Sequence, residues 1–155
     1  PYDVWVESKL ITATDGDVTD YDVVFRDIQA LGETFNIKEV ALDRWGATHL
    51  HARLEGAGVV VSEFGQGFKS MKDPTSELEA LIVARRLAHN DNPVMRWMAD
   101  NMMVKHDAAG SIKPDKGKSR EKIDGIVACI MALGRAMLHN AAGPSVYEKR
   151  GIETL

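Results

Sequence analysis

The sequence predicts an α/β fold in which helices connect parallel strands. Patterns typical of helices and of short strands alternate in the order helix, strand, helix, strand, helix. This order favours layers joined by crossover helices. The second strand run contains Val59, Val60 and Val61 in succession. Continuous β-branched runs are typical of parallel strands that are covered on both faces.

Five elements are expected in the first half of the chain. Apolar residues at three- and four-residue spacing predict an amphipathic helix, for which Thr19 or Asp20 is a suitable N-cap. Gly56 and Gly58 are expected to close a later helix. In chain order the expected elements are a short helix within 1–11, a helix at 21–36, a strand at 38–43, a helix at 47–55 and a strand at 59–64.

The second half is expected to be mainly helical and to contain one hairpin. A flexible turn at 65–67 precedes a helix that we expect to begin at Pro74, and Pro93 marks another break. The last helix has a broad apolar face. The expected elements are a helix at 74–87, a helical segment at 94–98, hairpin strands at 102–106 and 111–113, and a helix at 119–139.

Composition excludes several classes of site. The single cysteine, Cys129, excludes an intramolecular disulfide and a cysteine-based zinc cluster, and its apolar neighbours predict a buried side chain. No run approaches the ~20 apolar residues of a membrane span, so no membrane partner is expected. The chain lacks the Gly-x4-Gly-Lys frame of a Walker loop, so it does not carry an ATPase site of that type.

Asp43 ends the first strand run and is followed by Arg44. Open α/β sheets place ligands and catalytic groups beyond the carboxyl ends of their strands. An acid in this position can therefore act as a metal ligand. A helix-capping aspartate or a surface loop charge explains the same position, and spacing alone favours that simpler explanation.

Asp124 lies in the first turns of the last helix, between Ile123 and the apolar pair Ile126 and Val127. We expect its side chain to be drawn toward the packed face of the helix. A lone carboxylate there is costly to bury unless it is paired or bound to a cation. The alternative is that Asp124 only stabilises the positive N-terminus of the helix.

Together the two acids fit one chemistry. Phosphodiester hydrolysis by two metal ions needs carboxylates from separate elements to hold cations about 4 Å apart. The net charge is −4, yet residues 105–122 contain six Lys or Arg against three acids. This basic segment could face a phosphate backbone. Its composition fits a solvated hairpin equally well.

Several motifs, in order along nearly the whole chain, resemble those of phage terminase large subunits. Residues 40–48 (VALDRWGAT) resemble the second acidic motif of that family, and residues 122–128 (KIDGIVA) resemble the third. The other matching segments are FGQGFKSM at 64–71, Pro74-Thr75, ELE at 77–79, HNDNPVMRWM at 89–98, KPDK at 113–116 and SVYE at 145–148.

The resemblance implies an RNase H-like fold, with a mixed sheet flanked by helices. It also implies an endonuclease that cuts concatemeric double-stranded viral DNA during packaging, with two Mg²⁺ or Mn²⁺ ions as cofactors. Asp43 and Asp124 match the second and third metal-binding carboxylates. Residues 1–142 are expected to form the C-terminal part of the nuclease domain, and 143–155 a polar tail. The residues expected to bind DNA are Arg44, Lys113, Lys116 and Lys118.

One feature of the family has no match. Its first carboxylate lies on an opening strand well upstream of the motif matched by Asp43, and nothing before residue 20 has that character. We therefore expect the chain to begin inside the nuclease domain, incomplete at the N-terminus. The implied partners are double-stranded DNA, the phage portal, the small terminase subunit and an upstream ATPase domain of the same protein, in the bacterial host cytoplasm.

Two alternatives remain open. The chain could be a non-catalytic DNA-guiding or portal-docking module of the packaging motor, which binds through the basic segment at 113–122. A transposase- or resolvase-like nuclease would use the same carboxylate geometry.

Overall fold

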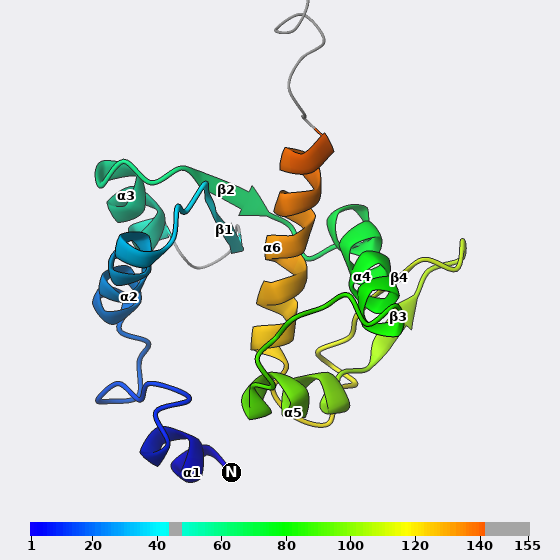
Figure 1. The fold of residues 1–155 in the computed structure, drawn as a ribbon, viewed down its shortest axis with the longest axis horizontal. Helices are drawn as coiled ribbons and strands as arrows, with labels where there is room; N and C mark the ends of the chain where they lie inside the picture. Colours follow the sequence, from blue (N-terminus) through cyan, green and yellow to red (C-terminus); the bar gives the residue numbers. More distant parts are fainter. Residues whose placement is uncertain (44–47, 142–155) are drawn as a thin grey trace, which may run out of the picture.

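The computed structural model describes residues 1–43 and 48–141, except for the side chains of residues 140 and 141. Figure 1 shows the arrangement of its helices and strands. In chain order these are α1 (Tyr2–Glu7), α2 (Tyr21–Thr34), β1 (Val40–Asp43), α3 (Thr48–Gly56), β2 (Val61–Phe64), α4 (Phe68–Val83), α5 (Pro93–Asn101), β3 (Val104–His106), β4 (Ile112–Pro114) and α6 (Asp124–Ala141).

β1 and β2 are paired in parallel, and α3 lies between them in the sequence. Val40 pairs with Val61 and Asp43 with Phe64, so both strands end at the same edge. Parallel strands need a crossover connection, and the segment containing α3 supplies it. The predicted α/β class is therefore confirmed. The predicted hairpin is also present, as the antiparallel strands β3 and β4.

The strands differ from expectation in how they combine. Within the described ranges they form two separate two-stranded sheets, one parallel and one antiparallel. Both strand directions occur, but no single sheet mixes them among these residues. α4 and α5 separate the two pairs in the chain, and α4 also packs against β4.

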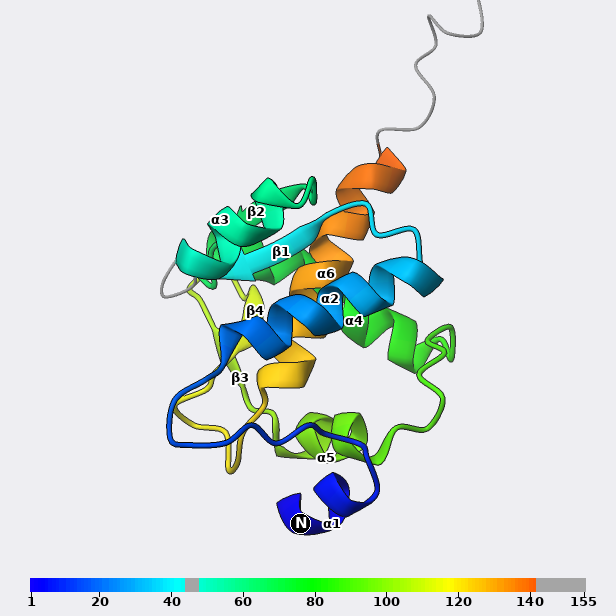
Figure 2. The same ribbon diagram turned by 90° about the vertical axis from the view of Figure 1, so that its left-hand side faces the viewer.

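The two faces of β1 pack against different helices. Val40 and Leu42 contact the apolar cluster around Phe25 of α2 and Leu54 of α3. Ala41 contacts the other cluster, which is built mainly from α4 and α6. Successive side chains of a strand alternate between faces. The odd-numbered residues of β1 therefore face α6, which lies behind β1 in Figure 2, while α2 lies in front.

The larger core lies between α4 and α6, with β2 against its edge. Met71 and Ile130 are almost fully buried there, and Phe64 reaches in from the end of β2. A Cβ atom on Gly134 would lie 3.1 Å from the Phe64 ring and 3.2 Å from Pro74. Glycine at this position therefore allows β2, α4 and α6 to approach closely.

Helix α4 begins earlier than predicted. It starts at Phe68 with Gly67 as its N-cap and contains Pro74 in its interior, so the prediction that Pro74 starts the helix was wrong. An interior proline removes a backbone hydrogen bond and normally disfavours a helix. Here Pro74 is buried against Gly134 of α6. Packing therefore outweighs the local preference.

Helix α6 begins later than predicted, at Asp124 rather than near residue 119. Ser119 is held in the preceding turn, where its hydroxyl donates to the Asp115 carbonyl oxygen and accepts from the Met103 backbone N–H. These bonds tie the segment to the β3–β4 hairpin and keep it out of the helix. Asp20 does serve as the N-cap of α2, as predicted.

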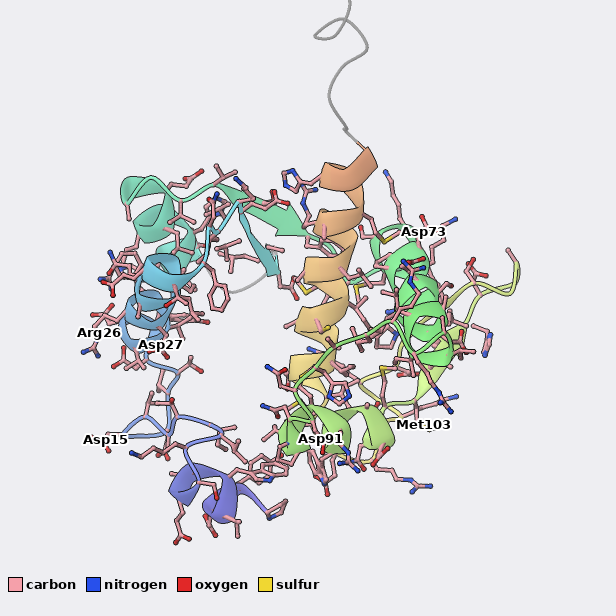
Figure 3. The ribbon with its side chains drawn as sticks, viewed as in Figure 1. Asp15, Arg26, Asp27, Asp73, Asp91 and Met103 are labelled. Carbon is pink, nitrogen blue, oxygen red and sulfur yellow. The ribbon has the colours of Figure 1, made fainter. Side chains whose placement is uncertain are left out.

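The N-terminal helix is attached through aromatic side chains. Tyr2 and Trp5 of α1 pack edge-on against each other and against Trp97 of α5. Charged side chains such as Arg26 and Asp27 cover the outer face of α2 (Figure 3). Among the described helices, none is long and apolar enough to cross a membrane. Arg44 and the tail predicted at 143–155 lie outside the described residues.

Candidate active site

Asp43 lies at the carboxyl end of β1 and faces α6, on the same side as Ala41. It is partly buried. Its Oδ2 accepts a hydrogen bond of 2.7 Å from Nε2 of Gln66, which lies in the turn between β2 and α4. The neighbouring strand therefore supplies a neutral donor that orients this carboxylate.

Asp124 is the first residue of α6 and its side chain is 64% exposed. Ile123 and Ile126 face the core instead. The expectation that Asp124 is drawn to the packed face was therefore wrong, because its position on the helix directs it to solvent. Its Oδ1 lies 2.8 Å from Nζ of Lys116. A negative charge here also stabilises the helix N-terminus.

A cavity of about 250 Å³ lies beside the partners of both acids. Gln66, which binds Asp43, and Lys116, which binds Asp124, both line it. The remaining lining residues are Met71, Lys105, Lys113, Pro114, Asp115, Gly117 and Val127. The structure thus connects the two predicted acids to one cavity through one side chain each.

The cavity is lined by lysines that reach it from both hairpin strands. Lys113 of β4 is partly buried, donates from Nζ to the Gln66 carbonyl oxygen at 2.9 Å, and lies over the Phe68 ring at 5.6 Å. Lys116 and Lys118 follow in the next turn and are exposed. A cavity with this charge fits an anionic ligand such as a phosphate group.

Gln66 and Lys105 were not among the residues assigned to the site from the sequence, although Gln66 lies in a matching motif and Lys105 begins the basic segment at 105–122. A signal for Gln66 was available. It follows Phe64 by two residues, and parallel strands end at the same sheet edge, so Gln66 was bound to lie near Asp43 once the strands paired. The signal for Lys105 was its place in the basic segment at 105–122, but which lysines line the cavity depends on how the hairpin packs.

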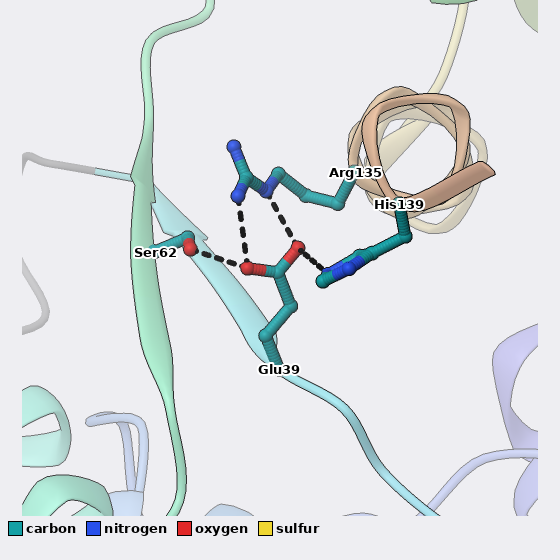
Figure 4. A network of polar contacts seen from close by, with 4 residues as sticks. All are labelled: Glu39, Ser62, Arg135 and His139. Atoms are coloured by element: carbon teal, nitrogen blue, oxygen red, sulfur yellow. Dashed lines mark hydrogen bonds and ion pairs between the residues drawn. The ribbon is translucent and has the colours of Figure 1, made fainter. Parts of the chain in front are cut away.

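A second polar cluster joins the start of β1 to β2 and α6 (Figure 4). Glu39 directly precedes β1, and its side chain is only 7% exposed. Its carboxylate contacts Nε of Arg135 at 2.6 Å, Oγ of Ser62 at 2.6 Å and Nε2 of His139 at 3.1 Å. The Arg135 hydrogen bond lowers the pKa of Glu39 to about 2, against the opposing effect of burial.

The donor chemistry of the candidate site fits a hard divalent cation. Mg²⁺ and Mn²⁺ prefer carboxylate oxygen, which both Asp43 and Asp124 provide. Within the described residues, however, no group of three or more His, Cys, Asp or Glu side chains could hold a metal ion. Asp43 and Asp124 therefore fit two of the ligands of a Mg²⁺ or Mn²⁺ site.

The comparisons with known proteins agree on one family. The model for the terminase large subunit, endonuclease domain, matches residues 1–140. The terminase large subunit of Enterobacteria phage HK97 is 39% identical over 138 residues, which cover 88% of this chain and 27% of that protein. Protein YmfN of Escherichia coli K12 is 37% identical over 137 residues, or 87% of this chain and 30% of that protein.

A solved structure agrees with these matches. The crystal structure of the HK97 bacteriophage large terminase superposes with a TM-score of 0.80 at 39% identity, over 87% of this chain and 29% of that one. This chain therefore spans less than a third of the length of the relatives that it matches.

Proposed function

The chain belongs to the family of terminase large subunit endonuclease domains, and from this premise we propose that it cleaves concatemeric double-stranded phage DNA by metal-dependent hydrolysis of phosphodiester bonds. The observation that carries the proposal is the connection of Asp43 and Asp124 to one lysine-lined cavity, through Gln66 and Lys116.

Asp43 and Asp124 would hold the metal, which we propose to be two Mg²⁺ or Mn²⁺ ions. Bound there, such ions would activate water and stabilise the leaving oxygen. A further carboxylate is needed beyond the described acids. We propose that it lies in a part of the full polypeptide outside these 155 residues, because the relatives are more than three times as long as the matched region.

The remaining residues bind and orient. Gln66 holds the Asp43 carboxylate through its amide, so that one oxygen keeps a fixed direction. Lys116 pairs with the Asp124 carboxylate. A metal ion that replaced Lys116 at this carboxylate would leave the ammonium group free to contact a phosphate. The residues proposed to contact the DNA backbone are Arg44, Lys113, Lys116 and Lys118.

The proposed setting follows from the family. The full polypeptide would act with its ATPase domain, the portal and the small terminase subunit in the host cytoplasm. Domain limits of 1–142 for the nuclease part and 143–155 for a tail remain a proposal.

The test is nicking of supercoiled plasmid by the full-length polypeptide in Mn²⁺. Asp43→Asn and Asp124→Asn keep the side-chain shape and remove the charge, and each is expected to lower the rate more than about 100-fold, beyond the usual effect of residues that only support metal ligands. Asp27→Asn, on the outer face of α2, is the control (Figure 3). Equal cleavage by all three variants would refute the proposal.

The exposed lysines favour one alternative, a DNA-guiding or portal-docking module without cleavage. That module would bind DNA in a salt-dependent way. Lys116→Ala and Lys118→Ala would weaken its binding, and Asp43→Asn would leave binding and the lack of cleavage unchanged.

A further inference from the structure

Glu39 directly precedes the strand that carries Asp43, and the two side chains lie on the same face. The two residues are four positions apart, and side chains an even number apart on extended backbone share a face. The packing agrees, because Ala41 between them contacts the cluster around α6. Glu39 and Asp43 are thus about 13 Å apart along the strand, and both face α6.

The helix that carries Asp124 also carries Arg135 on nearly the same face. Eleven residues separate them, which is close to three turns of 3.6 residues, or about 16 Å along the axis. In Figure 1, β1 descends while α6 rises. From the Glu39–Arg135 contact, Asp43 and Asp124 therefore lie in the same direction along their elements.

Contacts at Glu39 join three elements. Arg135 donates from Nε to Oε1 at 2.6 Å and from Nη2 to Oε2 at 3.0 Å, so both carboxylate oxygens are held by one guanidinium. Ser62 adds a hydrogen bond from β2, and His139 lies beside Oε1 from the next turn of α6. A bidentate pair of this kind fixes direction as well as distance.

The burial of Glu39 gives the contact its mechanical importance. A carboxylate that is 7% exposed is costly unless it stays paired. Sliding or tilting of α6 against β1 would break both guanidinium bonds at once. Over a lever of about 16 Å, a tilt of about 4° displaces the start of α6 by about 1 Å, and errors of that size can cost an active site about 100-fold in rate.

We propose that Glu39 and Arg135 form a positioning clamp that sets the placement of Asp124 relative to Asp43. The proposal rests on the proposed function, because it concerns the two acids assigned there to the metal. Neither clamp residue touches metal or DNA in it. Both act through the two elements that they join.

The test uses the full-length polypeptide with Glu39→Gln and Arg135→Met, and with Arg135→Lys as the conservative variant. Mn²⁺ affinity is measured by calorimetry, and kcat and KM by plasmid nicking. The first two variants are expected to weaken Mn²⁺ binding about 10-fold and to lower kcat about 10- to 100-fold, as for residues that support metal ligands. KM for DNA should stay within about twofold, and Arg135→Lys should recover part of both losses.

Glu63→Gln is the matched control, since Glu63 is exposed and directly follows Ser62 on β2. Ser62→Ala removes one hydrogen bond to Glu39 and should give a smaller loss of the same kind, which covers the case in which Glu39→Gln fails to fold. Folded clamp variants with wild-type Mn²⁺ affinity and kcat would overturn the clamp alone, provided that Asp43→Asn still abolishes cleavage. A wild-type protein that neither binds Mn²⁺ nor cuts DNA would overturn the proposed function as well.

Discussion

Gln66 and Asp43, 23 residues apart in sequence, are joined by a hydrogen bond of 2.7 Å from the side-chain amide to the carboxylate. The bond crosses from the end of one parallel strand to the turn after its neighbour. Gln66 is also held by Lys113, which donates to its backbone oxygen. The orientation of Asp43 therefore depends on the hairpin as well as on the parallel strands.

Replacing Gln66 by alanine is expected to lower Mn²⁺-dependent nicking about 10-fold, because the Asp43 carboxylate loses the donor that orients it. The measurement is initial nicking rate against Mn²⁺ concentration, and the loss should be partly recovered at high Mn²⁺. Gln29→Ala on the exposed side of α2 is the control. An unchanged rate would show that Gln66 has no part in the site.

Replacing Lys116 by methionine is expected to strengthen Mn²⁺ binding by up to about fivefold, since an exposed ion pair contributes at most about 1 kcal/mol. The same variant should bind DNA more weakly at low salt. Calorimetry with Mn²⁺ and a filter-binding assay measure the two effects. Lys118→Met removes the same charge two residues away and should leave Mn²⁺ affinity unchanged. Weaker Mn²⁺ binding by Lys116→Met would contradict the idea that Lys116 and Mn²⁺ compete for the Asp124 carboxylate.

The fold could be predicted from the sequence where the signals are local. Asp20 caps α2 as its side chain allows, and the short strand runs pair in parallel across α3. Prediction was wrong where packing decides. Pro74 lies inside α4, where it packs closely against Gly134 of α6. The local sequence pattern does not indicate that contact.

In the site, too, local motifs could be predicted from the sequence and long-range contacts could not. The motifs identified Asp43 and Asp124, and the structure adds what each one contacts, although their roles as metal ligands remain a prediction. The exposure of Asp124 depends on the exact start of α6. Glu39 lies within the strand run predicted at 38–43 and was given no role there, because its partner Arg135 is 96 residues away. Contacts across such a separation arise only once the helix and the sheet have packed.

The stability of the protein should depend on pH through Glu39. Its pKa is about 2 in the folded protein and 4.5 without these contacts. The lower folded value means that its stabilising effect is complete above pH 4.5 and is lost as the pH falls toward 2. Melting temperatures of wild type and Glu39→Gln should therefore differ by a constant amount from pH 5 to 7 and converge below pH 4.5. A difference that persists unchanged at pH 2.5 would contradict the assignment.

Replacing Gly134 by alanine tests the close packing beside the clamp. The new methyl group would lie 3.1 Å from two ring carbons of Phe64 and 3.2 Å from Pro74. At these distances the Phe64 ring or Pro74 must give way by a few tenths of an ångström, although both are buried. Overpacking of this kind costs about 1–3 kcal/mol, even though alanine is the better helix former. Denaturant unfolding measures this cost.

Gly56→Ala is the matched control, because nothing lies within 4 Å of its new methyl group. It should change the free energy of unfolding by less than about 1 kcal/mol. If the displacement reaches the acids, Gly134→Ala should also weaken Mn²⁺ binding, whereas Gly56→Ala should not. A loss of stability with unchanged Mn²⁺ affinity would mean that the displacement at Gly134 is absorbed locally and does not reach Asp43 or Asp124.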